Sequence, residues 1–107
     1  MRIRYYRSVR GDEPVRDYIA GLPAREQDDW DEALTLLGSF GLEAPVSLRQ
    51  LDRKLWEIRV GRQRVAYVIV TGPEMVLLHA FKKQRQRTSR RDLDLASRRA
   101  KEVLGGE

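Results

Sequence analysis

The chain has 107 residues, of which 41% are hydrophobic and 35% charged, as expected for a single globular domain spanning residues 1–107. It has no cysteine and one histidine, which excludes disulfides and thiolate metal sites, so we expect no metal or other cofactor. No apolar run approaches the roughly 18 residues of a membrane helix, and no signal-like segment follows Met1, so we expect a cytoplasmic protein without membrane contact.

The net charge of +5 is unevenly distributed along the chain. Residues 1–48 hold six of the 21 Lys and Arg residues and nine of the 16 Asp and Glu residues, a balance of −3. The remaining fifteen basic and seven acidic residues give residues 49–107 a balance of +8. A basic half on a small domain indicates a polyanionic partner such as nucleic acid, although a merely solubilising surface is the alternative.

The first half of the chain predicts one strand and two helices. Residues 2–7 alternate as a short strand, and Pro14 follows acidic residues at the expected start of a helix. A second helix is predicted from Pro23, with a negatively charged, solvated face in its early turns that suits the helix dipole. The apolar positions of the two helices have helical spacing: Val15, Tyr18, Ile19 and Leu22 in the first, and Trp30, Ala33, Leu34 and Leu37 in the second.

The second half predicts a loop over residues 42–53, three strands and a helix. The strands are expected at 54–60, 63–70 and 75–81, with Gly61-Arg62 as a tight hairpin turn. The helix is predicted to start near Ser89, which forms a capping pattern with Asp92, and to end at Gly105-Gly106. The order β-α-α-β-β-β-α indicates an α+β fold, an antiparallel sheet with helices packed on it.

The Gly61-Arg62 turn predicts an unusual pair of charges on the first hairpin. It sets Arg59 directly opposite Arg64, a like-charge pairing that destabilises a sheet unless something compensates. Glu57 lies on the same face and offers partial neutralisation, and a bound phosphate would complete it. The alternative is that both arginines extend into water at an exposed edge. The third strand brings Lys82 and Lys83 to the end of the sheet, whereas the face of His79 depends on a register that the sequence does not fix.

This arrangement suggests RNA cleavage. RNA supplies its own nucleophile, the 2′-hydroxyl, and needs a base, cations for the phosphate charge and an acid for the leaving 5′-oxygen. Arginine binds phosphate oxygens bidentately, and the base is either a lysine whose pKa is lowered by neighbouring cations or Glu57. The same basic face is equally compatible with simple RNA binding.

Three motifs in order carry a family resemblance: Leu55-Trp56-Glu57-Ile58-Arg59-Val60, Arg64-Val65-Ala66-Tyr67, and Leu77-Leu78-His79-Ala80-Phe81-Lys82-Lys83. Over residues 50–104 the chain resembles the RelE/HigB-like toxins of type II toxin–antitoxin systems, particularly the phage-derived HigB-type branch. The resemblance implies a RelE-like fold and a metal-independent endoribonuclease (an mRNA interferase) that inhibits translation by cutting mRNA in the ribosomal A site. It also implies two kinds of partner: the ribosome with its mRNA, and a cognate antitoxin, expected to be a helix-turn-helix protein.

By this resemblance Arg64 contacts the scissile phosphate, Lys82 and Lys83 match the basic end of the last strand, and Glu57 and Arg59 match the first motif. The tyrosine that RelE carries after its last strand is replaced by Thr88 or Ser89, and its lysine pair is matched only by the nearby Arg53 and Lys54, which leaves the base open. The residues that we expect to bind RNA are Arg53, Lys54, Arg62, Arg85, Arg87, Arg90 and Arg91. The alternatives are a ParE-like gyrase inhibitor and a non-catalytic RNA- or protein-binding module.

Overall fold

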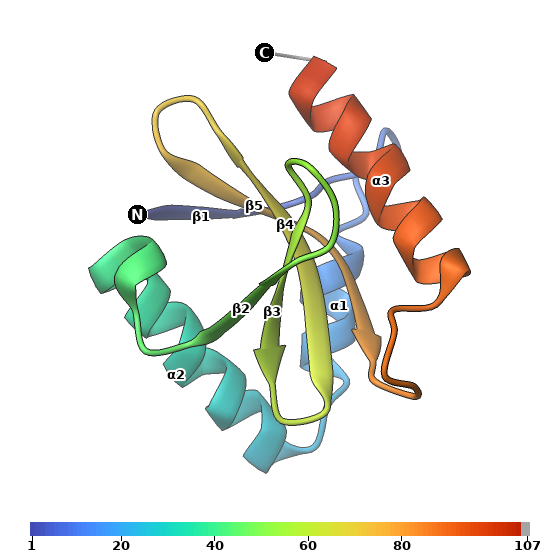
Figure 1. The fold of residues 1–107 in the computed structure, drawn as a ribbon. Coiled ribbons are helices and arrows are strands. Elements are labelled where there is room, and N and C mark those ends of the chain that lie inside the picture. Colours follow the sequence, from blue (N-terminus) through green and yellow to red (C-terminus); the bar gives the residue numbers. More distant parts are fainter. Residues whose placement is uncertain (106–107) are drawn as a thin grey trace.

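The computed structural model describes residues 1–105 and forms one mixed five-stranded sheet with helices on both faces (Figure 1). The elements in chain order are β1 (Arg2–Tyr5), α1 (Pro14–Ala20), α2 (Ala24–Phe40), a 3₁₀ turn η1 (Gly41–Glu43), β2 (Ser47–Gln50), β3 (Trp56–Val60), β4 (Gln63–Val70), β5 (Glu74–Lys82) and α3 (Arg90–Gly105). The α+β class is confirmed. The predicted end of the last helix is confirmed at Gly105, while Gly106 lies outside the described residues.

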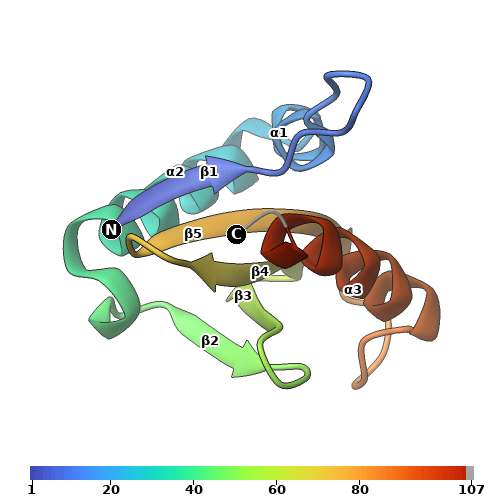
Figure 2. The same ribbon diagram turned by 90° about the horizontal axis from the view of Figure 1, so that it is seen from above.

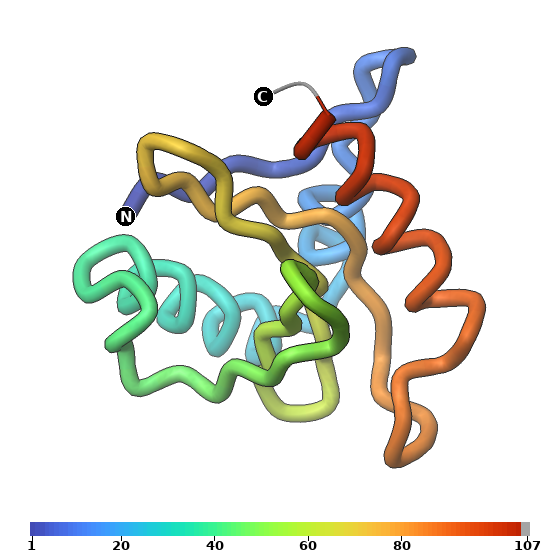
Figure 3. Tube along the Cα trace, turned by 45° about the horizontal axis from the view of Figure 1, so that its top comes forward, coloured from blue at the N-terminus to red at the C-terminus, as the bar shows by residue number. Residues whose placement is uncertain are grey.

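The strand order is β1-β5-β4-β3-β2, and this order differs from the prediction in two ways. The first strand pairs in parallel with β5, so the sheet is mixed rather than antiparallel throughout. The predicted loop over residues 42–53 is wrong in part, because Ser47–Gln50 forms β2 at the opposite edge and pairs with β3. Figure 3 shows how β1 runs beside the beginning of β5, although more than 65 residues separate them in the chain.

Two hydrophobic clusters lie on the two faces of the sheet. One packs α1 and α2 against the sheet through residues such as Trp30, Leu37 and Tyr67. The other packs α3 on the opposite face, where Ala96 and Ala100 belong to the same cluster as Ala66. Figure 2 shows the three layers edge-on. The middle strand β4 is therefore buried on both faces, and this explains its nearly continuous apolar sequence.

Local sequence signals explain where the elements begin and end. Pro14 occupies the first turn of α1, and Pro23 precedes α2 as its N-cap. Gly61 turns between β3 and β4 with a φ of 57°, a conformation that other residues rarely adopt. The hydroxyl oxygen of Ser89 accepts a hydrogen bond from the backbone N–H of Asp92 at 3.1 Å and so caps α3. None of the helices within residues 1–105 has the length and apolar character that crossing a membrane requires.

Candidate nucleic-acid cleft

The pairing of β3 with β4 has the predicted register. Arg59 lies opposite Arg64, and Glu57 lies opposite Ala66. The neighbouring strands extend these pairs into two rows across the sheet, on the face that α3 covers. One row runs Arg49, Glu57, Ala66 and His79, and the other runs Ser47, Arg59, Arg64 and Phe81. The sheet therefore places a carboxylate, three arginines and the histidine of the chain on one face.

These side chains line a cleft of about 630 Å³ between the sheet and the segment that leads into α3. The floor comes from the strands, and the wall comes from residues 83–89 together with Arg91, Asp92 and Leu95 of α3. The polar floor occurs here because α3 begins only at Arg90, so its apolar residues cover the sheet farther along. The cleft is thus the uncovered end of the sheet face on which α3 packs.

The electrostatic centre of the cleft is the group formed by Glu57, Arg59 and Arg64. Glu57 is 2% exposed and Arg64 is 6% exposed, so both are largely removed from water. Burial and the neighbouring Arg59 lower the pKa of Arg64, and the Glu57 carboxylate opposes this shift. Arg59 Nε lies 4.0 Å from Glu57 Oε2. With two arginines beside one carboxylate, the group keeps a net positive charge.

Arg64 is held in place by backbone groups of the hairpin turn. Its NH1 donates to the carbonyl oxygens of Gly61 at 2.8 Å and Gln63 at 2.9 Å. These bonds use one nitrogen of a guanidinium that carries five N–H donors. The guanidinium is therefore oriented before any ligand binds, as an anion site requires.

The face of His79, which the sequence left open, is set by an irregularity in β5. The register between β4 and β5 shifts between Ala66, which pairs with His79, and Tyr67, which pairs with Leu77. Leu78 is the extra residue, so Leu78 and His79 both lie on the α3 side of the sheet. Without this bulge, His79 would face the core beneath α1 and α2.

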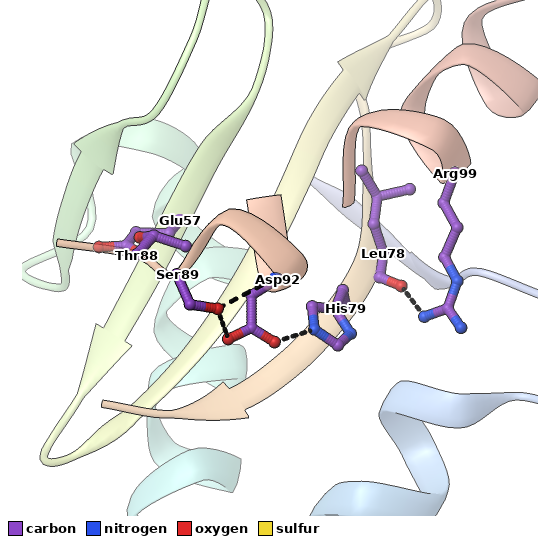
Figure 4. A network of polar contacts seen from close by, with 7 residues as sticks. All are labelled: Glu57, Leu78, His79, Thr88, Ser89, Asp92 and Arg99. Atoms are coloured by element: carbon purple, nitrogen blue, oxygen red, sulfur yellow. Dashed lines mark hydrogen bonds and ion pairs between the residues drawn. The ribbon is translucent and has the colours of Figure 1, made fainter. Parts of the chain in front are cut away.

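His79 belongs to a polar network that joins β5 to the first turn of α3 (Figure 4). His79 Nε2 lies 2.7 Å from Asp92 Oδ1. The hydroxyl of Ser89 donates to Asp92 Oδ2 at 2.7 Å. In the same segment, Thr88 Oγ1 donates to Glu57 Oε1 at 3.3 Å. The segment before α3 is therefore anchored to the sheet at both Glu57 and His79.

Three of the predicted catalytic residues, Glu57, Arg59 and Arg64, lie on one face of the sheet in this cleft, whereas the Lys82 side chain does not share that face, contrary to the prediction. All five line the cleft: Glu57, Arg59, Arg64, Lys82 and Lys83. The two lysines differ in position, because Lys82 pairs with Gln63 and so alternates to the other face of the sheet from Arg64. The backbone N–H of Lys83 donates to the carbonyl oxygen of Arg62 at 2.7 Å, which fixes the strand end. The chemical roles of these residues remain predictions.

The predicted RNA-binding residues divide into two groups. Those that line the cleft are Arg85, Arg87 and Arg91, and those that lie elsewhere on the surface are Arg53, Lys54, Arg62 and Arg90. Arg53 and Lys54 belong to the turn before β3, and Arg90 lies 3.7 Å from Asp94 within α3. Only the first group shares the cleft with Arg59 and Arg64.

Several residues of the cleft were not assigned a role from the sequence. Arg49 lies in the segment that was predicted as a loop, so nothing in the sequence aligned it with Glu57. Asp92 was interpreted as the partner of Ser89 in the capping pattern, and its Oδ2 accepts from the Ser89 hydroxyl, but its Oδ1 also contacts His79. Tyr18 fitted the apolar stripe of α1, yet its hydroxyl donates to Gln63 Oε1 at 2.5 Å at the rim of the cleft. Among residues 1–105, no group of three His, Cys, Asp or Glu side chains is arranged to hold a metal ion.

Comparison with known proteins identifies the family. No curated protein gave a significant match. One family model, described as phage-derived protein Gp49-like (DUF891), matches residues 17–101, which run from within α1 to most of α3 and include every strand except β1. The chain therefore belongs to the phage-derived Gp49-like family, a family related to the RelE-type toxins of toxin–antitoxin systems.

Proposed function

We propose that the protein is the toxin of a type II toxin–antitoxin system, of the HigB-type branch, and that it cleaves mRNA on translating ribosomes. The observation that carries the proposal is the cleft in which Arg59 and Arg64 face each other beside the buried Glu57. A like-charge pair on adjacent strands destabilises the fold, so its presence in a cleft favours an anionic ligand. Family membership supports a toxin role.

The chemistry follows from what RNA and these side chains can each supply. The 2′-oxygen attacks the adjacent phosphorus, its proton passes to a base, and the bond to the 5′-oxygen breaks. The products are a 2′,3′-cyclic phosphate and a 5′-hydroxyl. Arg64 and Arg59 stabilise the extra negative charge of the transition state, and the Glu57 carboxylate takes the 2′ proton.

The positive charge of the cleft favours two partners, RNA and an acidic segment of an antitoxin. Arg85, Arg87 and Arg91 line the cleft, where they can contact the backbone of mRNA or ribosomal RNA. A toxin of this family requires an antitoxin, and a segment that blocks the same basic cleft needs negative charge to do so. Thr88 has to give up its hydrogen bond to Glu57 when RNA reaches the carboxylate.

The proposal is tested with purified protein, ribosomes programmed with a defined mRNA, and primer extension to locate new ends. The wild type is expected to cut the mRNA and to leave 5′-hydroxyl ends that accept a labelled phosphate directly. Arg64→Ala is expected to lower the cleavage rate by roughly 100-fold or more, as for removal of a group that stabilises transition-state charge. Arg25→Ala is the matched control, because Arg25 is exposed on α2, on the other side of the sheet.

Intact mRNA in the presence of folded wild-type protein would overturn the nuclease proposal. Growth arrest that persists in Arg64→Ala, with double-strand breaks in DNA, would instead identify a gyrase poison. Salt-dependent binding to RNA with no cleavage and no arrest would identify a binding module.

A further inference from the structure

The outer edge of β5 is only partly covered by a neighbouring strand. β5 is nine residues long, but β1 pairs with only four of them, residues 74–77. At the next position, Arg99 of α3 takes the place of a strand, because its NH1 donates to the carbonyl oxygen of Leu78 at 2.8 Å (Figure 4). The rest of this edge, residues 79–82, has no neighbouring strand within residues 1–105.

Alternation along β5 shows which backbone groups of this free edge point away from the sheet. In an antiparallel pair, the N–H and C=O groups of successive residues point toward the partner strand and away from it in turn. The N–H of Lys83 donates to the Arg62 carbonyl at 2.7 Å and therefore points to the β4 side. The N–H and C=O groups of Lys82 and Ala80 then point outward, and no hydrogen bond to these groups is found within residues 1–105.

The free edge forms part of the cleft. Ala80 is only 9% exposed, yet both Ala80 and Lys82 line the cleft. Tyr18 of α1 and Leu95 of α3 line it as well, and these two helices pack on opposite faces of the sheet (Figure 2). Because buried backbone groups without a partner are costly, this edge favours a ligand that forms hydrogen bonds to them.

The surroundings of the free edge indicate an acidic peptide. An extended chain repeats its N–H and C=O groups at the spacing of a strand and can pair with both Ala80 and Lys82. The basic side chains of Lys82, Lys83 and Arg91 line the same cleft and favour negative charge in the ligand. The edge strands β1 and β2 of a second copy carry three arginines and no acidic residue, so self-pairing here would bring like charges together.

We propose that an acidic, extended segment of the antitoxin adds to the sheet at this free edge, along the same side of β5 as β1, and pairs with Ala80 and Lys82. This inference rests on the toxin–antitoxin role proposed above, but not on the cleavage chemistry. A segment of about four residues spans the free edge, since both strands advance by about 3.4 Å per residue. The segment occupies part of the cleft that contains Arg64, so it excludes RNA by its position as well as by its charge.

The test measures amide hydrogen exchange by NMR in the whole toxin, alone and bound to the protein encoded by the neighbouring reading frame. In the toxin alone, the N–H groups of Ala80 and Lys82 are expected to exchange faster than that of Phe81, which points to β4. In the complex, exchange at Ala80 and Lys82 is expected to be at least about 100-fold slower, whereas Phe81 is protected in both states.

A second measurement removes one outward N–H. Ala80→Pro keeps the bonds to β4 and is expected to weaken antitoxin binding about 10-fold or more in titration calorimetry. Ala80→Ser retains the N–H and is expected to bind within about threefold of the wild type. Gln50→Pro, in the opposite edge strand β2, is the matched control and is expected to bind like the wild type.

The outcomes separate this inference from the proposed function. A neighbouring protein that neither binds the toxin nor relieves its effect on growth contradicts the toxin–antitoxin role itself. Tight binding that leaves the two amides unprotected, or an Ala80→Pro variant that folds and binds like the wild type, overturns the strand pairing alone. Protection of the two amides by RNA, or by a higher concentration of the toxin alone, overturns the assignment of the edge to an antitoxin segment. If Ala80→Pro does not fold, hydrogen exchange in the wild type decides the question.

Discussion

Replacing Glu57 by glutamine is expected to destabilise the fold, although glutamine has almost the same shape and still accepts from Thr88. The carboxylate lies in a row with Arg49 and next to the facing pair Arg59 and Arg64. Without its negative charge, the mutual repulsion of these arginines is no longer compensated. The buried Arg64 is affected most, because Glu57 is the group that opposes the lowering of its pKa.

The magnitude follows from the geometry of the Glu57–Arg59 pair. Two unit charges at the observed 4.0 Å interact by about 4 kcal/mol at an effective dielectric constant of about 20. The Arg59 side chain is 35% exposed, so solvent screening removes half of this energy or more. The variant also avoids the cost of burying a charge at Glu57. We therefore expect Glu57→Gln to lower the free energy of unfolding by about 1–2 kcal/mol.

The assay is urea unfolding of the wild type, Glu57→Gln, Arg59→Met and the double variant. The coupling energy from this cycle is expected to be about 1 kcal/mol at low salt and to shrink at about 1 M NaCl. Glu32→Gln, on the exposed face of α2, is the matched control, with an expected change below about 0.5 kcal/mol. A Glu57→Gln variant as stable as the wild type, with no coupling to Arg59, would refute the electrostatic account of the cleft.

Three further predictions concern side chains that hold the layers together. Arg99→Ala loses the bond to the Leu78 carbonyl, so thermal unfolding is expected to show a loss of about 1–3 kcal/mol; unchanged stability would contradict a role for Arg99 in fixing the bulge. Burial raises the pKa of Tyr67 to about 12, so the native state keeps a proton that the unfolded chain releases above about pH 10. The free energy of unfolding is therefore expected to fall between pH 10 and 12, and to fall less in Tyr67→Phe; equal slopes in urea unfolding would contradict this. Trp30 Nε1 is buried without a hydrogen-bond partner in residues 1–105, so calorimetry is expected to show Trp30→Phe losing less stability than the roughly 3–5 kcal/mol of Trp30→Ala.

The sequence predicted the local parts of the fold better than the long-range ones. The Gly61-Arg62 turn fixed the register of β3 and β4, because a two-residue turn leaves one way to pair the strands. The parallel pairing of β1 with β5 depends on contacts between segments more than 65 residues apart, which no local pattern encodes. The short edge strand β2 was missed because Leu48 alone is an insufficient sign of alternation in Ser47–Gln50.

In the candidate site, too, the residues placed by local sequence could be predicted, and those placed by distant contacts could not. The positions of Arg59, Arg64 and Glu57 on one face could be predicted, because side chains alternate between the two faces along a single hairpin. The position of His79 could not, because the bulge at Leu78 reverses the alternation of β5, and the contact with Arg99 that fixes it comes from another element. The sequence indicated a basic sheet face, but it did not show that α3 packs on this same face and leaves the end near Arg64 as a cleft.

The wall of the cleft and the start of α3 are the same segment, and this has a consequence during synthesis of the protein. The arginine pair can form as soon as the β3–β4 hairpin has left the ribosome, since both residues lie before residue 65. Asp92 and the residues of α3 that cover the sheet emerge later, seconds after the hairpin at ordinary elongation rates of about 5–20 residues per second. The basic hairpin is therefore outside the ribosome for seconds before the segment that forms the other wall of the cleft has been synthesised.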